Sequence, residues 1–255
     1  LLKAIKEYLP LANDYELTLE GRIHDLIPEN LEVWMNNGVN RMSIGIQSFN
    51  TEVRQMVGRL DTKETVLERL AALKAYGQCS VVIDLIYGLP GQTMEVWEQD
   101  LADLVSSGVD GADLYQLNVF DGSDLNRDIA SGKVPPAATT SMQGDMFEFG
   151  RTYLEARAYR RLSAAHWSAN NRERSLYNIL AKAGVPMFPF GSGAGGNVDG
   201  YGMMLHRALK PYEDMVSRGE KPFMALMKQS DLQPFVNQVV SQLEQGYLDI
   251  NTLVA

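Results

Sequence analysis

Cysteine and histidine are scarce in this sequence. Its 255 residues include one cysteine, Cys79, which excludes an internal disulfide and makes a reducing compartment the expected one. The three histidines, His24, His166 and His206, do not have the spacing of zinc or di-iron ligands, so no metal site is expected within this chain. The Gly-x-Ser-x-Gly motif of serine hydrolases is also absent, and Cys79 is expected to fill space beside an apolar run rather than act as a nucleophile.

Long apolar runs and basic blocks are missing too. No stretch approaches the ~20 apolar residues of a membrane-spanning helix, and none has the layout of a secretory signal, so we expect no membrane span and a cytoplasmic location. The 23 Lys and Arg residues are outnumbered by 32 Asp and Glu residues, which gives a net charge of -9. This balance argues against nucleic acid or an anionic membrane as partner and leaves a small molecule or a protein.

An initiator methionine is absent as well. The sequence starts inside an amphipathic helical pattern, in which Leu1, Leu2, Ile5 and Leu9 share one side. We therefore expect a fragment whose natural N-terminus lies upstream of Leu1.

Residues 1–120 contain alternating strand and helix patterns. Strands are predicted at 16–20, 41–47, 80–88 and 113–120. Three helices are predicted between them. The first starts at Pro28 and ends at Asn37-Gly38, and the second starts at Asp61 with Glu64 and ends at Gly77. The third starts at Thr93 and ends at Gly108. Strands separated by helices are typical of an α/β fold with a parallel sheet.

Each predicted strand has an apolar and a polar face. In the last strand, Tyr115, Leu117 and Val119 are assigned to the apolar face. The opposite faces together hold small and polar residues, namely Thr18, Glu20, Ser43, Gly45, Gln47, Asp84, Gln116 and Asn118. A sheet covered on both sides should be apolar throughout, so the polar face either meets solvent or holds a polar ligand inside a barrel-like sheet. The helical crossovers favour the ligand.

Asp84 lies in the middle of the apolar segment "VVIDLIYGLPGQT", residues 81–93. A buried carboxylate without a partner costs several kcal/mol, so Asp84 is expected to have a polar partner or to face a ligand. The loop "GLPGQT", residues 88–93, follows the strand directly, where barrel enzymes gather their active-site loops, although a plain connector with a Thr cap has the same pattern.

Beyond residue 120 the pattern changes. Residues 121–140 have the composition of a long connection, and helices are predicted at about 140–160, within 171–184 and over roughly the last 45 residues. Residues 121–255 are therefore expected to form a mostly helical extension that packs on the sheet.

Three features allow two interpretations each. The Gly-rich segment "FGSGAGGNVDGY", residues 190–201, can bring backbone N–H groups to an anionic ligand or form a tight turn. Arg59 can bind a carboxylate or lie on the surface. His166 can contact a substrate or be a buried structural histidine.

Three segments in this order resemble the radical S-adenosylmethionine enzymes related to oxygen-independent coproporphyrinogen III oxidase. They are "ELTLEGR" (16–22), "NGVNRMSIGIQSFNTEVRQMVGR" (37–59) and "VVIDLIYGLPGQT" (81–93). The segment at 165–204, which begins "AHWSANNRERSLYN", is similar to the heme-utilisation branch, the anaerobilin synthase-like methyltransferases.

The resemblance implies a partial (β/α)6 barrel of TIM type, whose N-terminal βα units are missing from this chain. S-adenosylmethionine would lie across the strand ends, and Arg59 would pair with its methionyl carboxylate. The implied cofactor-binding residues are Glu20, Gln47, Arg59, Asp84, Ile86 and Asn118. His166, Gly193 and Gly195 are candidates for contact with a substrate or a second cofactor molecule.

One family motif is absent. The Cys-x-x-x-Cys-x-x-Cys loop that ligates a [4Fe–4S] cluster does not occur, and Cys79 alone cannot replace three thiolates. The cluster ligands are therefore expected upstream of Leu1, and residues 1–255 alone are expected to be inactive.

The resemblance implies a heme or porphyrin substrate and a reduced electron donor of the flavodoxin or ferredoxin type. The leading hypothesis is anaerobic opening of the heme ring with methyl transfer and iron release. The alternatives are a heme chaperone that passes heme to an acceptor, or an oxygen-independent coproporphyrinogen III oxidase. Candidate partners for the heme propionates are Arg22, Arg160, Arg161 and Arg172.

Overall fold

The computed structural model describes residues 1–253 and divides the chain into two compact units, Leu1–Arg174 and Ser175–Ala255. The division falls at 174/175 rather than at the expected 120/121. The reason is that two strands after residue 120 complete the sheet of the first unit, and a long helix after residue 120 packs into its core.

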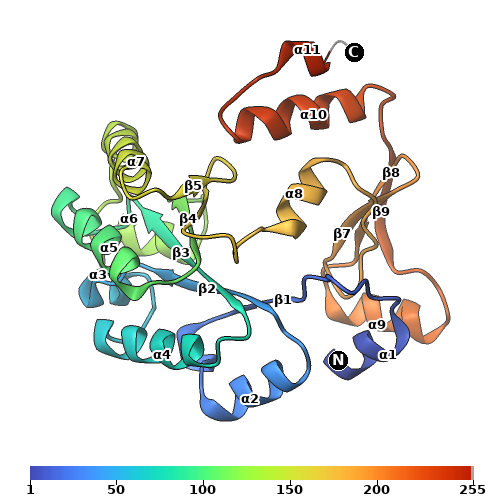
Figure 1. Ribbon diagram of the computed structural model, residues 1–255, viewed down its shortest axis with the longest axis horizontal. Coiled ribbons are helices and arrows are strands. Elements are labelled where there is room, and N and C mark those ends of the chain that lie inside the picture. The colour runs from blue at the N-terminus through green and yellow to red at the C-terminus, as the bar shows by residue number, and fades with distance from the viewer. Residues whose placement is uncertain (254–255) are drawn as a thin grey trace. The chain divides into compact units, whose positions relative to one another are not determined.

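The first unit is built on a six-stranded sheet of order β1-β2-β3-β4-β6-β5 (Figure 1). Its strands are β1 (Thr18–Gly21), β2 (Arg41–Gln47), β3 (Ser80–Tyr87), β4 (Gly111–Gln116), β5 (Arg160–Arg161) and β6 (His166–Ser168). Strands β1 to β4 are parallel, and β6 pairs antiparallel with β4 and β5. The predicted parallel sheet is thus confirmed.

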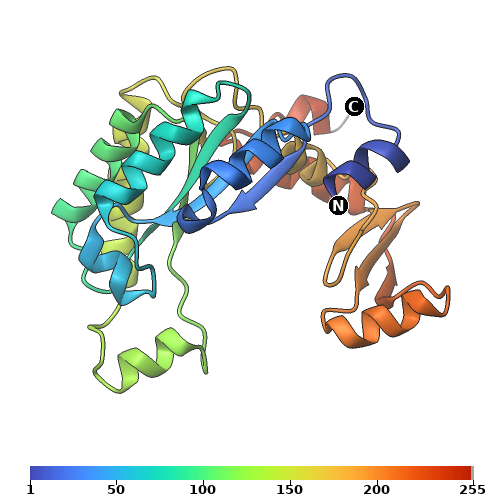
Figure 2. The ribbon, with the colours of Figure 1, turned by 90° about the horizontal axis from the view of Figure 1, so that it is seen from below.

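Helices cover one face of this sheet (Figure 2). The helices of the unit are α1 (Leu2–Tyr8), the 3-10 helix η1 (Ile23–Asp25), α2 (Pro28–Asn36), α3 (Thr51–Met56), α4 (Lys63–Ala75), α5 (Met94–Ser107), α6 (Asp124–Ala130) and α7 (Thr140–Glu155). Apolar side chains of α2, α4, α5 and α7 form one core with the apolar faces of β2, β3 and β4, for example Leu70, Trp97 and Met146 with Ile44 and Ile83. The opposite face of the parallel strands carries the polar residues.

Local signals explain most helix ends. Thr93 caps α5 by accepting a hydrogen bond from the Val96 N–H, and Gly108 ends it in the left-handed conformation, as predicted. The cap of α4 is Thr62 rather than the predicted Asp61. Asp61 turns instead toward Arg54, whose Nη2 lies 3.8 Å from its carboxylate. Helix α6 was not predicted; Figure 2 shows it standing apart from the sheet.

The second unit has more helix than strand, but it contains an antiparallel sheet of order β7-β8-β9 that was not predicted. Its elements are α8 (Leu176–Lys182), β7 (Gly195–Val198), β8 (Tyr201–Leu205), α9 (Leu209–Ser217), β9 (Phe223–Lys228), α10 (Gln233–Glu244) and α11 (Ile250–Leu253). Asp199 and Gly200, both with positive φ, form the two-residue turn between β7 and β8. Within residues 1–253, no helix has the length and apolarity to cross a membrane.

Candidate functional site

The polar face of the parallel strands brings acidic side chains together across neighbouring strands. Gly45 on β2, Asp84 on β3 and Asp113 on β4 are register partners, so they lie side by side in one row. Glu20 on β1 is the partner of Ser43 in the preceding row. Side chains of paired residues in parallel strands point to the same face, so these groups share one surface.

Asp84 is the central residue of this row. Its Oδ1 accepts a hydrogen bond from Ser43 Oγ at 3.1 Å. Burial, followed by repulsion from Asp113, raises the pKa of Asp84 to about 6, which outweighs the opposite effect of the Ser43 hydrogen bond. Asp84 therefore faces inward as predicted, and Ser43 satisfies one of its two carboxylate oxygens.

Three of the expected cofactor residues surround Gly45. A Cβ atom on Gly45 would lie 2.7 Å from Gln47 Nε2, 3.7 Å from Arg59 Nη2 and 3.9 Å from Asp84 Oδ2. Only the absence of a side chain at position 45 leaves room for an amide, a guanidinium and a carboxylate at one point. The structure thus brings Gln47, Arg59 and Asp84 together.

Gln47 reaches this point because β2 ends in an irregularity. The pairing of β2 with β3 shifts between Gly45 and Gln47, and Gln47 has a φ of 73°, a conformation that costs a non-glycine residue of order 1 kcal/mol. Arg54 holds the distorted segment, since its buried guanidinium donates hydrogen bonds to the carbonyls of Ile46 and Ser48. Its Nε donates to the carbonyl of Asp61 at 2.9 Å, on the segment that carries Arg59.

A cavity of about 410 Å³ opens beside Arg59, with Arg22, Gly45 and Asp61 in its wall. Burial and then the neighbouring Arg22 lower the pKa of Arg59, although a guanidinium stays charged at neutral pH. Two guanidinium groups close enough to repel each other favour an anion between them. Arg59 is thus placed to hold a carboxylate, and Arg22 is near enough to assist.

The remaining expected cofactor residues lie around this group in different ways. Glu20 is exposed and close enough to raise the pKa of Asp84 further. Ile86 is half-buried on the same face of β3 as Asp84, and its carbonyl accepts a hydrogen bond from Gln92 Nε2 at 3.1 Å. Asn118 is exposed and lies two residues beyond the end of β4, outside the sheet.

The face assignment in the last parallel strand needs correction. Because β4 runs over Gly111–Gln116 rather than 113–120, Asp113 and Tyr115 lie on the polar face beside Asp84 and Ile86. Gln116 lies on the helix-covered face, where its Nε2 donates to Gln143 Oε1 of α7 at 2.8 Å. Asp113 was therefore missed, because the alternation was counted through Leu117 and Val119, which lie beyond the strand.

His166 lies in the core of the first unit, with 1% of its surface exposed. Its Nδ1 lies 2.9 Å from Asp113 Oδ2 as an ion pair without the alignment of a hydrogen bond, and its Nε2 pairs with Glu173 Oε1 at 3.1 Å. Glu173 also accepts from Arg41 Nε at 3.0 and 3.1 Å. These contacts favour the structural interpretation of His166 over direct contact with a substrate.

Gly193 and Gly195 belong to the second unit. The Gly193 N–H donates to the carbonyl of His206 at 2.8 Å, and Gly195 is paired with Met204 at the start of β7. A turn followed by a hairpin therefore accounts for both glycines, in agreement with the structural alternative for the Gly-rich segment.

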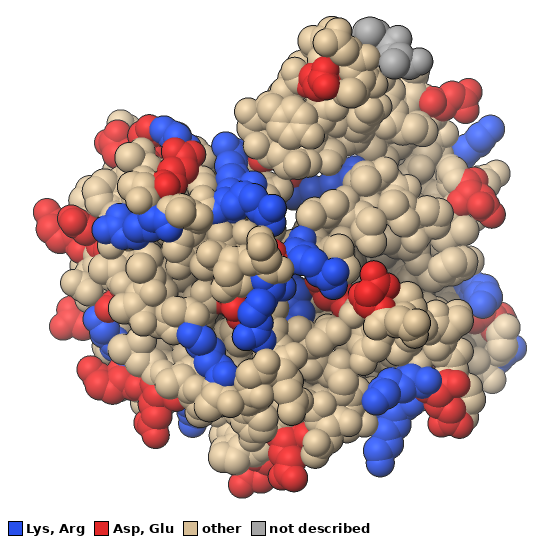
Figure 3. Space-filling model, viewed as in Figure 1, with Lys and Arg blue, Asp and Glu red and all other residues tan. Residues whose placement is uncertain are grey.

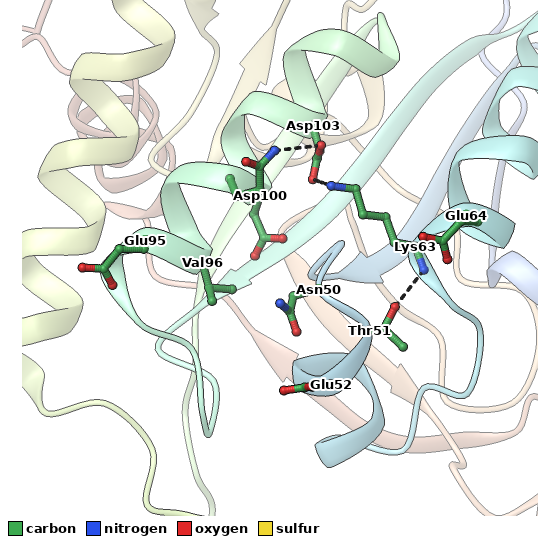
Figure 4. Close-up of a pocket in the computed structure, with 10 residues that line it drawn as sticks. Asn50, Thr51, Glu52, Lys63, Glu64, Glu95, Val96, Asp100 and Asp103 are labelled. Atoms are coloured by element: carbon green, nitrogen blue, oxygen red, sulfur yellow. Dashed lines mark hydrogen bonds and ion pairs between the residues drawn. The ribbon is translucent and has the colours of Figure 1, made fainter.

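Another cavity, of about 460 Å³, lies between the starts of α3 and α4 and one side of α5, and none of the expected cofactor residues lines it (Figure 4). Lys63 reaches Asp103 there at 2.6 Å. Beside it, the buried Asp100 accepts hydrogen bonds from Ser48 Oγ and the Phe49 N–H, and also from Gln92 Nε2. Burial raises the pKa of Asp100 to about 6 despite these bonds. Asp100 thus joins the loop that follows β2 to the loop that follows β3.

The residues on the polar face fit S-adenosylmethionine but offer no ligand set for an iron–sulfur cluster. The gap over Gly45 presents the Arg59 guanidinium for a carboxylate, and the Asp84 carboxylate for a sulfonium or ammonium group. Cys79 is 3% exposed, and burial raises the pKa of its thiol to about 11, which disfavours the thiolate that a cluster requires.

On the side that Figure 3 shows, acidic and basic side chains are intermixed at the surface.

Comparisons with known proteins show which proteins the chain is similar to. The Radical SAM superfamily model matches residues 2–104. Anaerobilin synthase from Escherichia coli O157:H7 is 36% identical over 231 residues, which cover 91% of this chain and 52% of that protein. The heme chaperone HemW from Lactococcus lactis is 29% identical, with 97% of this chain and 69% of that protein covered.

The solved structure of coproporphyrinogen III oxidase (HemN) from Escherichia coli matches 99% of this chain and 60% of its own, with a TM-score of 0.84 and 19% identity. This likeness confirms the predicted fold. The chain spans about half the length of the anaerobilin synthase that it matches. Members of the matching superfamily use S-adenosylmethionine and a [4Fe–4S] cluster. The chain carries a radical SAM domain over residues 2–104.

Proposed function

We propose that the protein is a radical S-adenosylmethionine enzyme that acts on heme or a related porphyrin, by anaerobic ring opening with methyl transfer and iron release. One observation carries the cofactor part of the proposal, namely the convergence of Gln47, Arg59 and Asp84 on the space over Gly45. The 36% identity to an anaerobilin synthase over 91% of the chain supports the substrate class.

Within this proposal the chain's own residues bind and orient the cofactor. Arg59, assisted by Arg22, holds the methionyl carboxylate, and Asp84 faces the positively charged end. Glu20, Ile86 and Asn118 are proposed contacts of the nucleoside and its surroundings. When bound, S-adenosylmethionine with the cluster supplies radical chemistry. Residues 1–255 alone are expected to bind the cofactor without turnover, because Cys79 is their only cysteine.

The test is to incubate the intact, cluster-reconstituted protein anaerobically with heme, S-adenosylmethionine and a reductant. We expect loss of the heme spectrum, release of iron and formation of 5′-deoxyadenosine, all of which should be lost in Asp84→Asn. Exposed Asp145→Asn on α7 serves as the matched control with full turnover. An unchanged heme spectrum without 5′-deoxyadenosine would contradict the proposal. Omission of reduced flavodoxin or ferredoxin in a parallel series tests the proposed electron donor.

A heme chaperone is the second candidate, and the match of HemW to 97% of this chain favours it. The same incubation separates the two, because a chaperone would bind heme stoichiometrically and leave its ring intact. Oxygen-independent oxidation of coproporphyrinogen III remains an alternative, and coproporphyrinogen as substrate in place of heme tests it. A cytoplasmic location is proposed from the single cysteine and is checked by fractionation.

A further inference from the structure

A line of buried charges leads from the candidate cofactor site into the core of the first unit. Asp84 and Asp113 are register partners on β3 and β4. His166 lies between Asp113 and Glu173, and Glu173 pairs in turn with Arg41 at 3.0 Å. From Asp113 onward, carboxylates alternate with cationic groups, and the line ends at Arg41 at the start of β2.

The deep part of this line is fully built. Asp113 and Arg41 are each 6% exposed, His166 is 1% exposed and Glu173 is fully buried. Glu173 also accepts a hydrogen bond from Ser80 Oγ at 2.8 Å. Buried ions persist only beside opposite charges, so these four groups stabilise one another.

Gly111 makes the arrangement possible. A Cβ atom at this position would lie 3.0 Å from the Cγ atom of Glu173 and 2.7 Å from the carbonyl oxygen of Trp167. Glycine at the start of β4 thus leaves the space that the Glu173 side chain occupies.

The charges of the line do not cancel. Although burial opposes it, the carboxylates of Asp113 and Glu173 raise the pKa of His166 to about 9, so that it is an imidazolium at neutral pH. His166 and Arg41 then supply two positive charges against the three carboxyl groups of Asp84, Asp113 and Glu173. One negative charge is left, and it falls on Asp84, whose end of the line faces the site.

The other charged and titratable groups around Asp84 do not remove this imbalance. Glu20 on β1 adds repulsion, and Tyr115 on β4 carries no charge at neutral pH, since burial, followed by Asp113 and Asp84, raises its pKa still further above that range. Arg59 and Asp84 attract each other across the gap over Gly45, but Arg59 also faces Arg22 and Asp61, and the pKa of Asp84 stays raised. The raised pKa of Asp84 agrees with this count of charges.

We propose that Asp84 exchanges its proton for a cationic ligand, and that His166 and Asp113 are positioning residues that set the pH at which it does so. The inference rests on the proposed function, since the cation is the sulfonium or ammonium group of S-adenosylmethionine. On binding, the Asp84 carboxyl group gives its proton to the solvent and the carboxylate faces the positive charge. No covalent bond to carbon, nitrogen or sulfur changes.

The test is calorimetric titration of the intact protein with S-adenosylmethionine in buffers of different ionisation enthalpy, which reports the protons released per ligand. We expect about half a proton at pH 6, because Asp84 is then half protonated, and about a tenth of a proton at pH 7. Asp84→Asn should bind without proton release at either pH. Absence of binding would contradict the proposed function itself, whereas wild-type binding without release at pH 6 would overturn only this inference.

Two further variants test the positioning role. His166→Gln removes a positive charge and should move proton release to a higher pH, while Asp113→Asn removes a negative charge and should move it to a lower pH. A purely structural role predicts no such opposite shifts. Exposed Glu148→Gln serves as the control with the wild-type profile. Folded variants with an unchanged pH profile would overturn the role of the line, and the wild-type measurement stands even where a variant fails to fold.

Discussion

The amide Nε2 of Gln47 lies 2.7 Å from the point where a Cβ atom on Gly45 would stand. Real Cβ atoms do not come this close to a neighbour, so any side chain at position 45 would displace Gln47. Because Nε2 is the end of the flexible Gln47 side chain, its displacement would disturb the site more than the fold.

Gly45→Ala tests this relationship. We expect the affinity for S-adenosylmethionine to fall about 10-fold or more, since a misplacement of about 1 Å at such a site is costly, while the free energy of unfolding changes by less than about 1 kcal/mol. The measurements are calorimetric titration and urea unfolding. The control is Gly144→Ala in α7, where a Cβ atom meets nothing within 4 Å, and where alanine should stabilise the helix by about 0.5–1 kcal/mol without affecting binding. Wild-type affinity in Gly45→Ala would contradict the prediction.

Arg54→Lys tests the support of the distorted end of β2. A lysine cannot reproduce the planar set of donors that reaches the carbonyls of Ile46, Ser48 and Asp61. We expect a loss of about 2–4 kcal/mol in the free energy of unfolding, together with weaker cofactor binding. Arg151→Lys on α7 is the matched control, because Arg151 pairs only with the exposed Glu148 and Glu155 of its own helix, and it should unfold like the wild type. Equal unfolding curves for both variants would show that Arg54 does not hold this segment.

Asp100→Asn tests the connection between the two loops. The amide keeps one acceptor but presents an NH₂ group toward the donors of Ser48, Phe49 and Gln92, so we expect a loss of about 1–3 kcal/mol. Urea unfolding measures it, and Glu98→Gln on the exposed side of the same helix provides the control. Stability equal to that of the control variant would be the contrary result.

His166 should make stability depend on pH. Its pKa is raised in the folded state to about 9, so its contribution is complete below about pH 6.5 and is lost as the pH rises through about 9. We expect His166→Gln to cost about 3–5 kcal/mol at pH 7 and to remove the decline of stability between pH 6.5 and 9. Unfolding midpoints from pH 6 to 10 provide the measurement.

The exposed His24→Gln is the control for this experiment and should keep the wild-type decline. If His166→Gln keeps the same decline, another group causes it.

The elements that were predicted well depend on local patterns. β2 is observed over Arg41–Gln47, as predicted, because three apolar residues alternate with small and polar ones along it. Asp84, Gln47 and Arg59 were predicted from this alternation and from family resemblance, and the structure brings them together. Strand period sufficed for Asp84, because it fixes which side chains of a regular strand face inward. Gln47 reaches the site through the irregular end of β2, and Arg59 followed from the family resemblance.

Other features depended on signals that were missed or do not exist locally. The Asp199-Gly200 pair is a strong hairpin signal between strands, but it was interpreted only as part of a Gly-rich loop. Arg54, Asp100 and His166 are buried beside partners from other elements, which lie 52 residues away for Asp100 and Ser48 and, since 166 − 113 = 53, 53 residues away for His166 and Asp113. No local pattern identifies such partners.

The single carboxylate of Asp100 has a consequence for motion in the first unit. This carboxylate accepts hydrogen bonds from the loop that follows β2 and from the loop that follows β3. The two loops are therefore held to the same group, and a rearrangement of either loop breaks part of the hydrogen-bond set that they share. Ordering of one loop by a bound molecule would therefore lower the entropic cost of ordering its neighbour. Two segments 40 residues apart along the chain would respond to occupancy as a single body.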